Sequence, residues 1–351
     1  MKRFLNLVFV LALVLGLAAL TGCGGEEKKA EPKAEQAVEQ TAEQAAPAKK
    51  DKQFLAFGGG PTGGTFNFFA NKMASIIAHT YDYLDMSPKG SGGSAENLRT
   101  LDKASVDFGI VYSGDAYLGR AGLLVNDTTK YENVRGISFL YGAPAQLVVR
   151  KDSGINSAYD LEGKIVAVGN PGSGAALSAE RFFKHIGVWE KMEARNLGYS
   201  QAAADFSDNK IDAFWVLVGY PNSSIIEAAT RTPVILLDLN ADAEKSGFYD
   251  AFPFYSPVEI PAGTYEGQEA VVKTFQDSAL WCASAKVDDD VVYDSLTAVY
   301  AEQGLKDMVT AHKAAKNMSI ENGIAGVSVP LHPGAIKFWT EKGLTIPDNL
   351  K

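Results

Sequence analysis

The sequence predicts an α/β fold of two lobes, each a mainly parallel sheet flanked by helices, with a hinge and a cleft between the lobes. Apolar, strand-like runs alternate with helix-like stretches, which is typical of a parallel sheet covered on both faces. About 300 residues follow the N-terminal region, more than a single core usually holds. The alternation also restarts near Asp160. These observations together favour two lobes over one.

The N-terminal region reads as a targeting signal followed by a tether. Lys2 and Arg3 precede an apolar run from 4 to 20, and Cys23 follows it. We expect residues 1–22 to be a lipoprotein signal, cut before a cysteine that carries lipid. The alternative is an uncleaved membrane anchor, since the run is near the lower length limit for a span. Residues 23–52 contain few large apolar side chains and are expected to be a flexible tether. The body would then be extracytoplasmic and held at the membrane.

The net charge limits the classes of binding partner, and the cysteine content limits the disulfides. The chain has a net charge of -9, which becomes -11 when the two positive charges of the signal are removed. Such an acidic body argues against nucleic acid or an anionic membrane surface as its partner. Apart from Cys23 the chain has only Cys282, so the mature fold has no disulfide available. Cys282 lies in an apolar run and is expected to be a buried thiol.

Lobe 1 is expected to comprise residues 53–147 and 253–351. Its first half contains an apolar strand at 54–57, a helix at 66–78, a short apolar segment at 83–86, a helix at 95–101 and a strand at 106–111. Two further strands are expected at 134–140 and 146–149. Gly142, Ala143 and Pro144 lie between them and suggest a crossover.

Lobe 2 is expected to comprise residues 148–252. It contains strands at 165–168, 213–218 and 234–237 and helices at 175–186 and 223–229. The chain returns to lobe 1 near 251–253. There we expect strands at 255–260 and within 278–287, and helices at 288–302 and 334–342. Two or more crossings between the lobes would form a hinged clamp.

Glycine turns at strand ends are the most informative feature. Turns at 58–65, 91–94 and 171–174 each precede a helix, where free backbone N–H groups and the helix dipole hold an anion. A single such turn is equally explained by local packing. The first turn nearly matches a phosphate loop, but Gly64 stands where that motif requires lysine, so a carboxylate fits better than a nucleotide.

The candidate ligand-binding residues therefore cluster at these turns and at nearby strand ends. Hydroxyl groups at helix starts would add donors, with simple capping as the alternative. Aromatic side chains near strand ends would line the cleft, with core packing as the alternative, above all for Trp215. The candidates are Gly60, Thr62, Gly64, Thr65, Gly93, Ser94, Tyr112, Ser113, Gly172, Ser173, Gly174, Ala175, Trp215 and Tyr220. Asp115 either binds an amino group of the ligand or caps its own helix.

Catalysis and metal binding have little support. Ser173 lacks the flanking glycines of a nucleophile elbow, which are needed two positions away on each side. The four histidines are scattered singly, without metal-ligand spacing. We therefore expect no enzyme activity, no cofactor and no metal.

The chain resembles the TAXI family, the TRAP-associated extracytoplasmic immunogenic proteins. The resemblance runs from about Gln53 to Leu350 and rests on the order and spacing of several motifs. These are Gly63-Gly64-Thr65, the segments 92–98, 106–111 and 160–164, Gly172-Ser173-Gly174, Pro333-Gly334-Ala335 and Gly343-Leu344. The chain departs from the family at Tyr112, where many relatives have a polar amide, and in its lipid anchor.

The resemblance implies a two-lobe periplasmic-binding-protein fold, type II-like, and a receptor role. Such a receptor captures a small organic anion or amino acid, glutamate-like or a dicarboxylate, and delivers it to a TRAP permease with fused small and large subunits. Two alternatives stay open. One is a sensory lipoprotein that reports to a membrane kinase; the other is a receptor for an ATP-driven (ABC) transporter. A monomer is the default oligomeric state.

Overall fold

The computed structural model describes residues 50–351, which form a ten-stranded mixed sheet flanked by helices. The expected signal, most of the tether and Cys23 lie outside the described residues. The main path of the sheet runs β2-β1-β3-β10-β4-β7-β5-β6, with β8 paired to β4 and β9 to β10. The strands are β1 (Gln53–Gly58), β2 (Leu84–Lys89), β3 (Phe108–Tyr112), β4 (Val134–Arg150), β5 (Ile165–Ala167), β6 (Glu193–Arg195), β7 (Ala213–Leu217), β8 (Val234–Leu236), β9 (Ser256–Ile260) and β10 (Val272–Ser284).

Helices cover the sheet and bury one apolar face each. In α1 the buried residues recur at helical spacing, as Phe66, Phe69, Met73 and Ile77 show. The α-helices are α1 (Thr65–Thr80), α2 (Ser94–Asp102), α3 (Ser113–Ala121), α4 (Gly174–His185), α5 (Tyr199–Ser207), α6 (Ser223–Arg231), α7 (Leu239–Ser246), α8 (Phe248–Ala251), α9 (Asp289–Val299), α10 (Glu302–Ala311) and α11 (Pro333–Glu341). Short 3-10 helices are η1 (Ala158–Leu161), η2 (Trp189–Lys191), η3 (Lys313–Asn317) and η4 (Asp348–Leu350). None of the helices in 50–351 is both long and apolar enough to cross a membrane.

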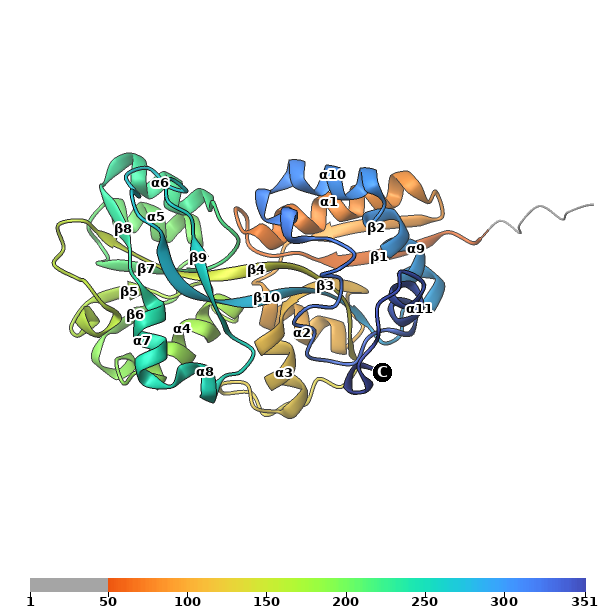
Figure 1. Ribbon diagram of the computed structural model, residues 1–351, viewed down its shortest axis with the longest axis horizontal. Coiled ribbons are helices and arrows are strands. Elements are labelled where there is room, and N and C mark those ends of the chain that lie inside the picture. Colours follow the sequence, from red (N-terminus) through yellow and green to blue (C-terminus); the bar gives the residue numbers. More distant parts are fainter. Residues whose placement is uncertain (1–49) are drawn as a thin grey trace, which may run out of the picture. The chain divides into compact units, whose positions relative to one another are not determined.

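Two lobes share this sheet (Figure 1), which confirms the predicted fold class. In lobe 1, β1 pairs in parallel with β2 and β3, and β10 closes the group in antiparallel orientation. In lobe 2, β5 pairs in parallel with β6 and β7, while β4 runs antiparallel to β7 and β8. The parallel strands direct their carboxyl ends toward the helix starts that form the site described below.

The hinge differs from the prediction. Instead of two strands with a crossover at 142–144, a single strand β4 runs unbroken from Val134 to Arg150. Pro144 lies where β4 changes its partner from β10 to β7, so its missing N–H removes no essential hydrogen bond there. Gly142 leaves room for the Gln276 side chain, which would otherwise overlap a Cβ atom. Gly142 and Pro144, residues that often end strands, therefore mark the place where β4 passes between the lobes rather than a turn.

The boundary of lobe 2 also differs from the expected position at 252. Ile260 and Tyr265 pack in a cluster with Phe206 and Phe214 of lobe 2. Phe275, at the start of β10, packs against Trp215 with ring centroids 5.9 Å apart. Segment 256–276 therefore lies in lobe 2, and the second crossing takes place within β10. The predicted helix at 288–302 is likewise wrong in extent, because α9 ends at Val299 and a separate α10 follows.

Candidate functional site

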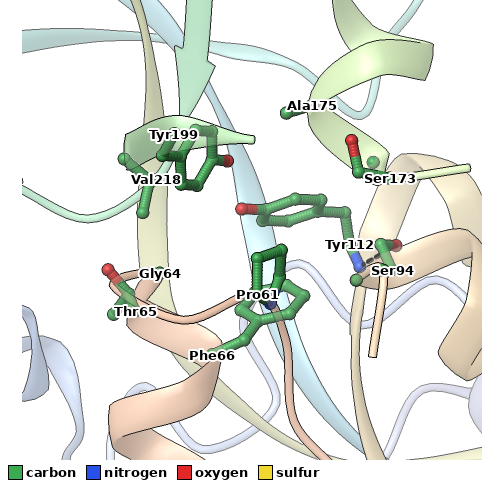
Figure 2. A pocket seen from close by; sticks show the side chains of 13 residues that line it. Pro61, Gly64, Thr65, Phe66, Ser94, Tyr112, Ser173, Ala175, Tyr199 and Val218 are labelled. Atoms are coloured by element: carbon green, nitrogen blue, oxygen red, sulfur yellow. Dashed lines mark hydrogen bonds between the residues drawn. The ribbon is translucent and has the colours of Figure 1, made fainter. Parts of the chain in front are cut away.

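The N-termini of α1 and α2 from lobe 1 and of α4 and α5 from lobe 2 meet at one small cavity (Figure 2). The N-cap residues are Gly64, Gly93, Ser173 and Gly198. The first N–H groups of a helix have no partner within the helix and carry the positive end of its dipole. The lining residues are Pro61, Gly64, Thr65, Phe66, Gly92, Gly93, Ser94, Tyr112, Ser173, Gly174, Ala175, Tyr199 and Val218.

Glycine is required at two positions where the lobes touch. Gly93 has φ +116°, a conformation that side-chain-bearing residues rarely adopt. Gly174 begins α4, and a Cβ atom there would lie 2.4 Å from the Tyr112 ring and 2.6 Å from Asp115 Oδ2. These glycines let the start of α4 in lobe 2 approach the start of α2 and the end of β3 in lobe 1.

Tyr112 lies at the centre of the cavity. Its backbone N–H donates to Ser94 Oγ at 2.9 Å, and its hydroxyl donates to the carbonyl of Leu217 at the end of β7. The ring packs on Phe66 with centroids 4.7 Å apart. Burial raises the pKa of Tyr112 well above its usual range, so the phenol stays protonated and remains a donor.

Hydroxyl groups without partners face the same region. Thr65 is buried, and within residues 50–351 neither its Oγ1 nor the Tyr141 hydroxyl makes a hydrogen bond of regular geometry, although Thr65 lies close enough to lower the pKa of Tyr141. The Tyr199 hydroxyl donates to the Leu217 carbonyl at 3.3 Å. A buried hydroxyl without a partner costs free energy, so Thr65 is a ready contact for a bound polar group.

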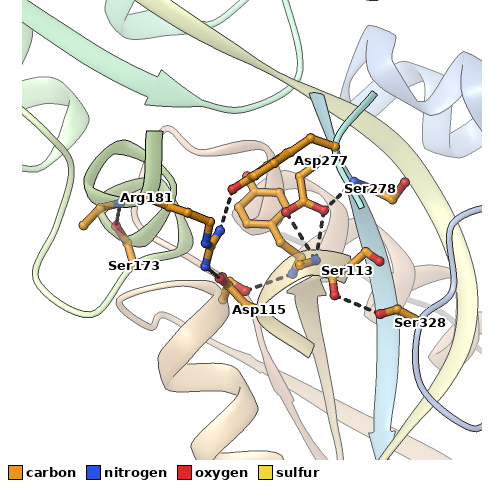
Figure 3. Close-up of polar contacts among 12 residues, drawn as sticks. Ser113, Asp115, Ser173, Arg181, Asp277, Ser278 and Ser328 are labelled. Carbon is orange, nitrogen blue, oxygen red and sulfur yellow. Dashed lines mark hydrogen bonds and ion pairs between the residues drawn. The ribbon is translucent and has the colours of Figure 1, made fainter. Parts of the chain in front are cut away.

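A buried charge cluster lies directly behind the cavity (Figure 3). Arg181 of α4 forms an ion pair with Asp115 of α3 at 3.2 Å, and the two side chains are 4% and 1% exposed. Arg181 also donates to the Tyr255 hydroxyl. Asp277 of β10 accepts from the backbone N–H groups of Gly114 at 3.2 Å and Ser278 at 2.8 Å. The cluster thus joins α3, α4 and β10.

One guanidinium group faces two buried carboxyl groups in this cluster. Burial raises the pKa of Asp277 to about 8, with the Asp115 charge as the second cause. Burial also raises the pKa of Asp115, but the Arg181 charge opposes that rise. We infer from the ion pair that Asp115 is the charged member, and the pKa of about 8 favours a proton on Asp277 at neutral pH.

Eight candidates line this cavity: Gly64, Thr65, Gly93, Ser94, Tyr112, Ser173, Gly174 and Ala175. Gly60, Thr62, Ser113 and Gly172 are adjacent in the chain but do not line it. Tyr220 lines a separate hollow beside η3, together with Lys313 and Lys316. That any of these residues binds a ligand stays a prediction.

Trp215 lies in the core rather than in the cleft. It is the middle residue of β7, is 1% exposed and packs against Phe182 and Phe183. Sequence reasoning missed Pro61, Phe66, Gly92, Tyr199 and Val218 as lining residues. A signal existed for Tyr199, because Gly198 precedes it at a helix start just as Gly64 precedes Thr65.

Several polar side chains that could suggest catalysis or metal binding serve as helix caps. The Ser173 hydroxyl accepts from the Ala176 N–H and serves as an N-cap. His312 and His332 likewise cap η3 and α11. Across residues 50–351 no three His, Cys, Asp or Glu side chains are grouped so as to hold a metal ion.

Two lobes joined by crossing strands, with helix N-termini at the cavity between them, define a periplasmic-binding-protein-like α/β fold. The profile of the NMT1-like family matches residues 57–343, and the chain belongs to that family.

Several solved structures are similar to this chain. The periplasmic aliphatic sulphonate binding protein SsuA from Escherichia coli is 15% identical, with 83% of this chain and 84% of that chain covered and a TM-score of 0.43. The alkanesulfonate-binding protein SsuA from Xanthomonas axonopodis pv. citri, bound to MOPS, is 12% identical over 84% and 92%, with a TM-score of 0.45. A structure described as a periplasmic transporter is 13% identical over 85% and 93%, with a TM-score of 0.49.

Proposed function

We propose that this protein is an extracytoplasmic solute receptor that captures a small carboxylate between its lobes. In this proposal Cys23 anchors it to the membrane through lipid, and the receptor delivers its solute to a TRAP permease. The observation that carries the proposal is the convergence of helix N-termini from both lobes on a cavity where the Thr65 hydroxyl has no regular hydrogen bond within residues 50–351. Backbone N–H groups and a hydroxyl bind a carboxylate without a charged side chain.

The acceptors near the cavity favour an amino acid over a dicarboxylate. Asp115 Oδ2 lies beside Gly174 and makes no hydrogen bond of regular geometry within residues 50–351, although the nearby Ser94 hydroxyl lowers the pKa of Asp115. The Leu217 carbonyl is a second acceptor near the cavity, available to a ligand only when the Tyr112 or Tyr199 hydroxyl releases it. A ligand with one carboxylate and one ammonium group complements both kinds of protein group, whereas a second carboxylate would face acceptors.

Thermal unfolding of the ligand-stripped full chain in detergent tests this proposal. L-glutamate, L-glutamine and glutarate form the central comparison, because glutarate has both carboxylates of glutamate and lacks its amine. A ligand at a thousandfold over its dissociation constant adds about 4 kcal/mol of stability. We expect a large shift with an amino acid and a much smaller one with glutarate. Equal shifts in melting temperature with glutamate and glutarate would exclude a contact between Asp115 and the ligand amine. No shift with any of the acids would exclude the receptor function.

A variant ties the shift to this cavity. Thr65→Val keeps the shape of the side chain but removes the hydroxyl, and we expect about a tenfold loss of affinity from one lost hydrogen bond to a charged group. Thr310→Val, on the exposed side of α10, is the matched control and should bind as the unmodified chain does. Unchanged affinity in Thr65→Val would show that the ligand carboxylate does not bind at the start of α1.

Sensing and ATP-driven transport remain the alternatives, since each needs the same closing clamp. Reconstitution distinguishes them. Uptake of the identified solute into vesicles with the cognate permease, driven by an ion gradient without ATP, supports TRAP transport. A requirement for ATP supports the cassette class, and activation of a membrane kinase supports sensing.

A further inference from the structure

Tyr112 connects the two lobes through contacts at opposite ends of the residue. Its backbone ends β3 in lobe 1 and is held by Ser94. Its hydroxyl reaches the Leu217 carbonyl at the end of β7 in lobe 2. Between these ends, the ring packs on Phe66 and against Gly174, and the residue is 5% exposed. The side chain therefore bridges the cleft as a bound solute would.

The space left beside Tyr112 is very small. The volume open to the centre of a water molecule is about 20 Å³, which holds roughly one water. Any amino acid or dicarboxylate is several times larger. With the lobes in this arrangement, a solute and the Tyr112 ring exclude each other (Figure 2).

We propose that Tyr112 is an internal competitor of the solute: its phenol occupies the interlobe site and holds the lobes together, and solute binds only after Tyr112 has left. This inference rests on the proposed receptor function. The stability of the Tyr112-occupied state then determines how tightly a solute must bind in order to displace the phenol. The Leu217 carbonyl, released by the phenol, keeps its bond from the Tyr199 hydroxyl and can accept a donor of the solute.

The proposal predicts a direction of change opposite to that of an ordinary contact residue. When the competent state is a minor fraction of the population, the apparent dissociation constant is the intrinsic one divided by that fraction. Minor states commonly hold about 10% or less. Removing the phenol should therefore tighten solute binding by about tenfold or more, whereas removing a contact would weaken it.

Three variants separate occupancy, hydrogen bonding and general destabilisation. Tyr112→Ala removes the occupant. Tyr112→Phe keeps the ring but loses the hydroxyl bond to Leu217, and about a fivefold tightening is expected from one neutral hydrogen bond. Tyr300→Ala is the matched control, because Tyr300 is also 5% exposed and donates its hydroxyl to a backbone carbonyl, that of Phe139, outside the cavity.

Calorimetric titration of the full chain and these variants tests the proposal, using the acid that most stabilises the unmodified chain. We expect tighter binding in Tyr112→Ala and Tyr112→Phe and none of this gain in Tyr300→Ala. Added 4-methylphenol, the detached Tyr112 side chain, should reverse the gain in Tyr112→Ala. Unchanged or weaker binding in both Tyr112 variants would overturn the proposal, and Tyr112→Phe alone decides if Tyr112→Ala fails to fold.

A second readout does not depend on the solute. Titrated alone, 4-methylphenol should bind Tyr112→Ala once per chain and about fivefold more tightly than toluene, which lacks the donor for Leu217. It should not bind the unmodified chain. If no acid binds any protein but this phenol binding is observed, the receptor function fails while occupancy by Tyr112 stands. If 4-methylphenol does not bind Tyr112→Ala, the ring does not fill a preformed site and the proposal is refuted.

Discussion

Replacing Asp277 by asparagine should change how the stability of the protein depends on pH. Asp277 is 1% exposed, and burial together with the Asp115 charge raises its pKa from the ordinary 3.8 to about 8. Arg181 and the Gly114 N–H oppose this rise without cancelling it. The Tyr255 hydroxyl also faces the cluster and stays protonated, since burial raises its pKa to about 12. At neutral pH the folded protein therefore holds one proton that the unfolded chain has released.

The sign and size of the pH effect on the free energy of unfolding follow from proton linkage. Between pH 3.8 and about 8 the folded state binds more protons than the unfolded state at this group, so the contribution of Asp277 is largest at low pH and is lost as pH rises through that window. Each pH unit changes the free energy of unfolding by about 1.4 kcal/mol. From about pH 5 to about pH 8 the total is on the order of 4 kcal/mol.

An asparagine side chain at this position would resemble the protonated carboxyl group at every pH. Its carbonyl oxygen can still accept from the N–H groups of Gly114 and Ser278. Urea unfolding at about pH 5, 6, 7 and 8 gives the free energies for the unmodified chain and for Asp277→Asn. We expect the stability of the variant relative to the unmodified chain to rise by several kcal/mol across the series. Asp152→Asn, at an exposed position, should show no such trend. Parallel profiles for Asp277→Asn and the unmodified chain would refute a proton on Asp277.

Three further substitutions test the contacts around the cavity. Gly174→Ala places a methyl group 2.4 Å from the Tyr112 ring, so solution scattering should show more separated lobes; unchanged scattering would contradict the close approach. Arg181→Met leaves Asp115 buried without its cation and should cost about 3–5 kcal/mol in urea unfolding, and a loss below about 1 kcal/mol would show the pair to be dispensable. Gly93→Ala, at φ +116°, should cost about 1–3 kcal/mol, and a neutral effect would show that α2 can start differently.

The sequence predicted those parts of the fold that depend on local chemistry. Glycine turns before apolar helices identified the starts of α1, α2 and α4, because glycine and the helix N-terminus act within a few residues. The continuity of β4 was not predictable in the same way. Gly142 and Pro144 are breakers by local rules, and only their pairing with β10 and β7 makes them compatible with one strand.

The contents of the site were predicted less well than its location. Arg181, Asp115 and Asp277 meet through helix and strand packing between residues far apart in the chain, and no local pattern marks that meeting. For Trp215 the local sequence pattern was visible but did not distinguish between two locations. Its place in an apolar run fits either a cleft or a core, and only the direction of the side chain from β7 decides for the core.

The shared strands also affect how the chain can fold during synthesis. Within residues 50–351, the edge of β3 that faces away from β1 pairs with residues 279–283 of β10, which are made after all of lobe 2. Until then lobe 1 exposes an unpaired strand edge, a template for wrong association with other chains. The same interlocking makes independent unfolding of one lobe unfavourable, because β4 and β10 belong to both sheet halves. A chain built in this way gains a single cooperative body at the cost of a long interval in which its first lobe is incomplete.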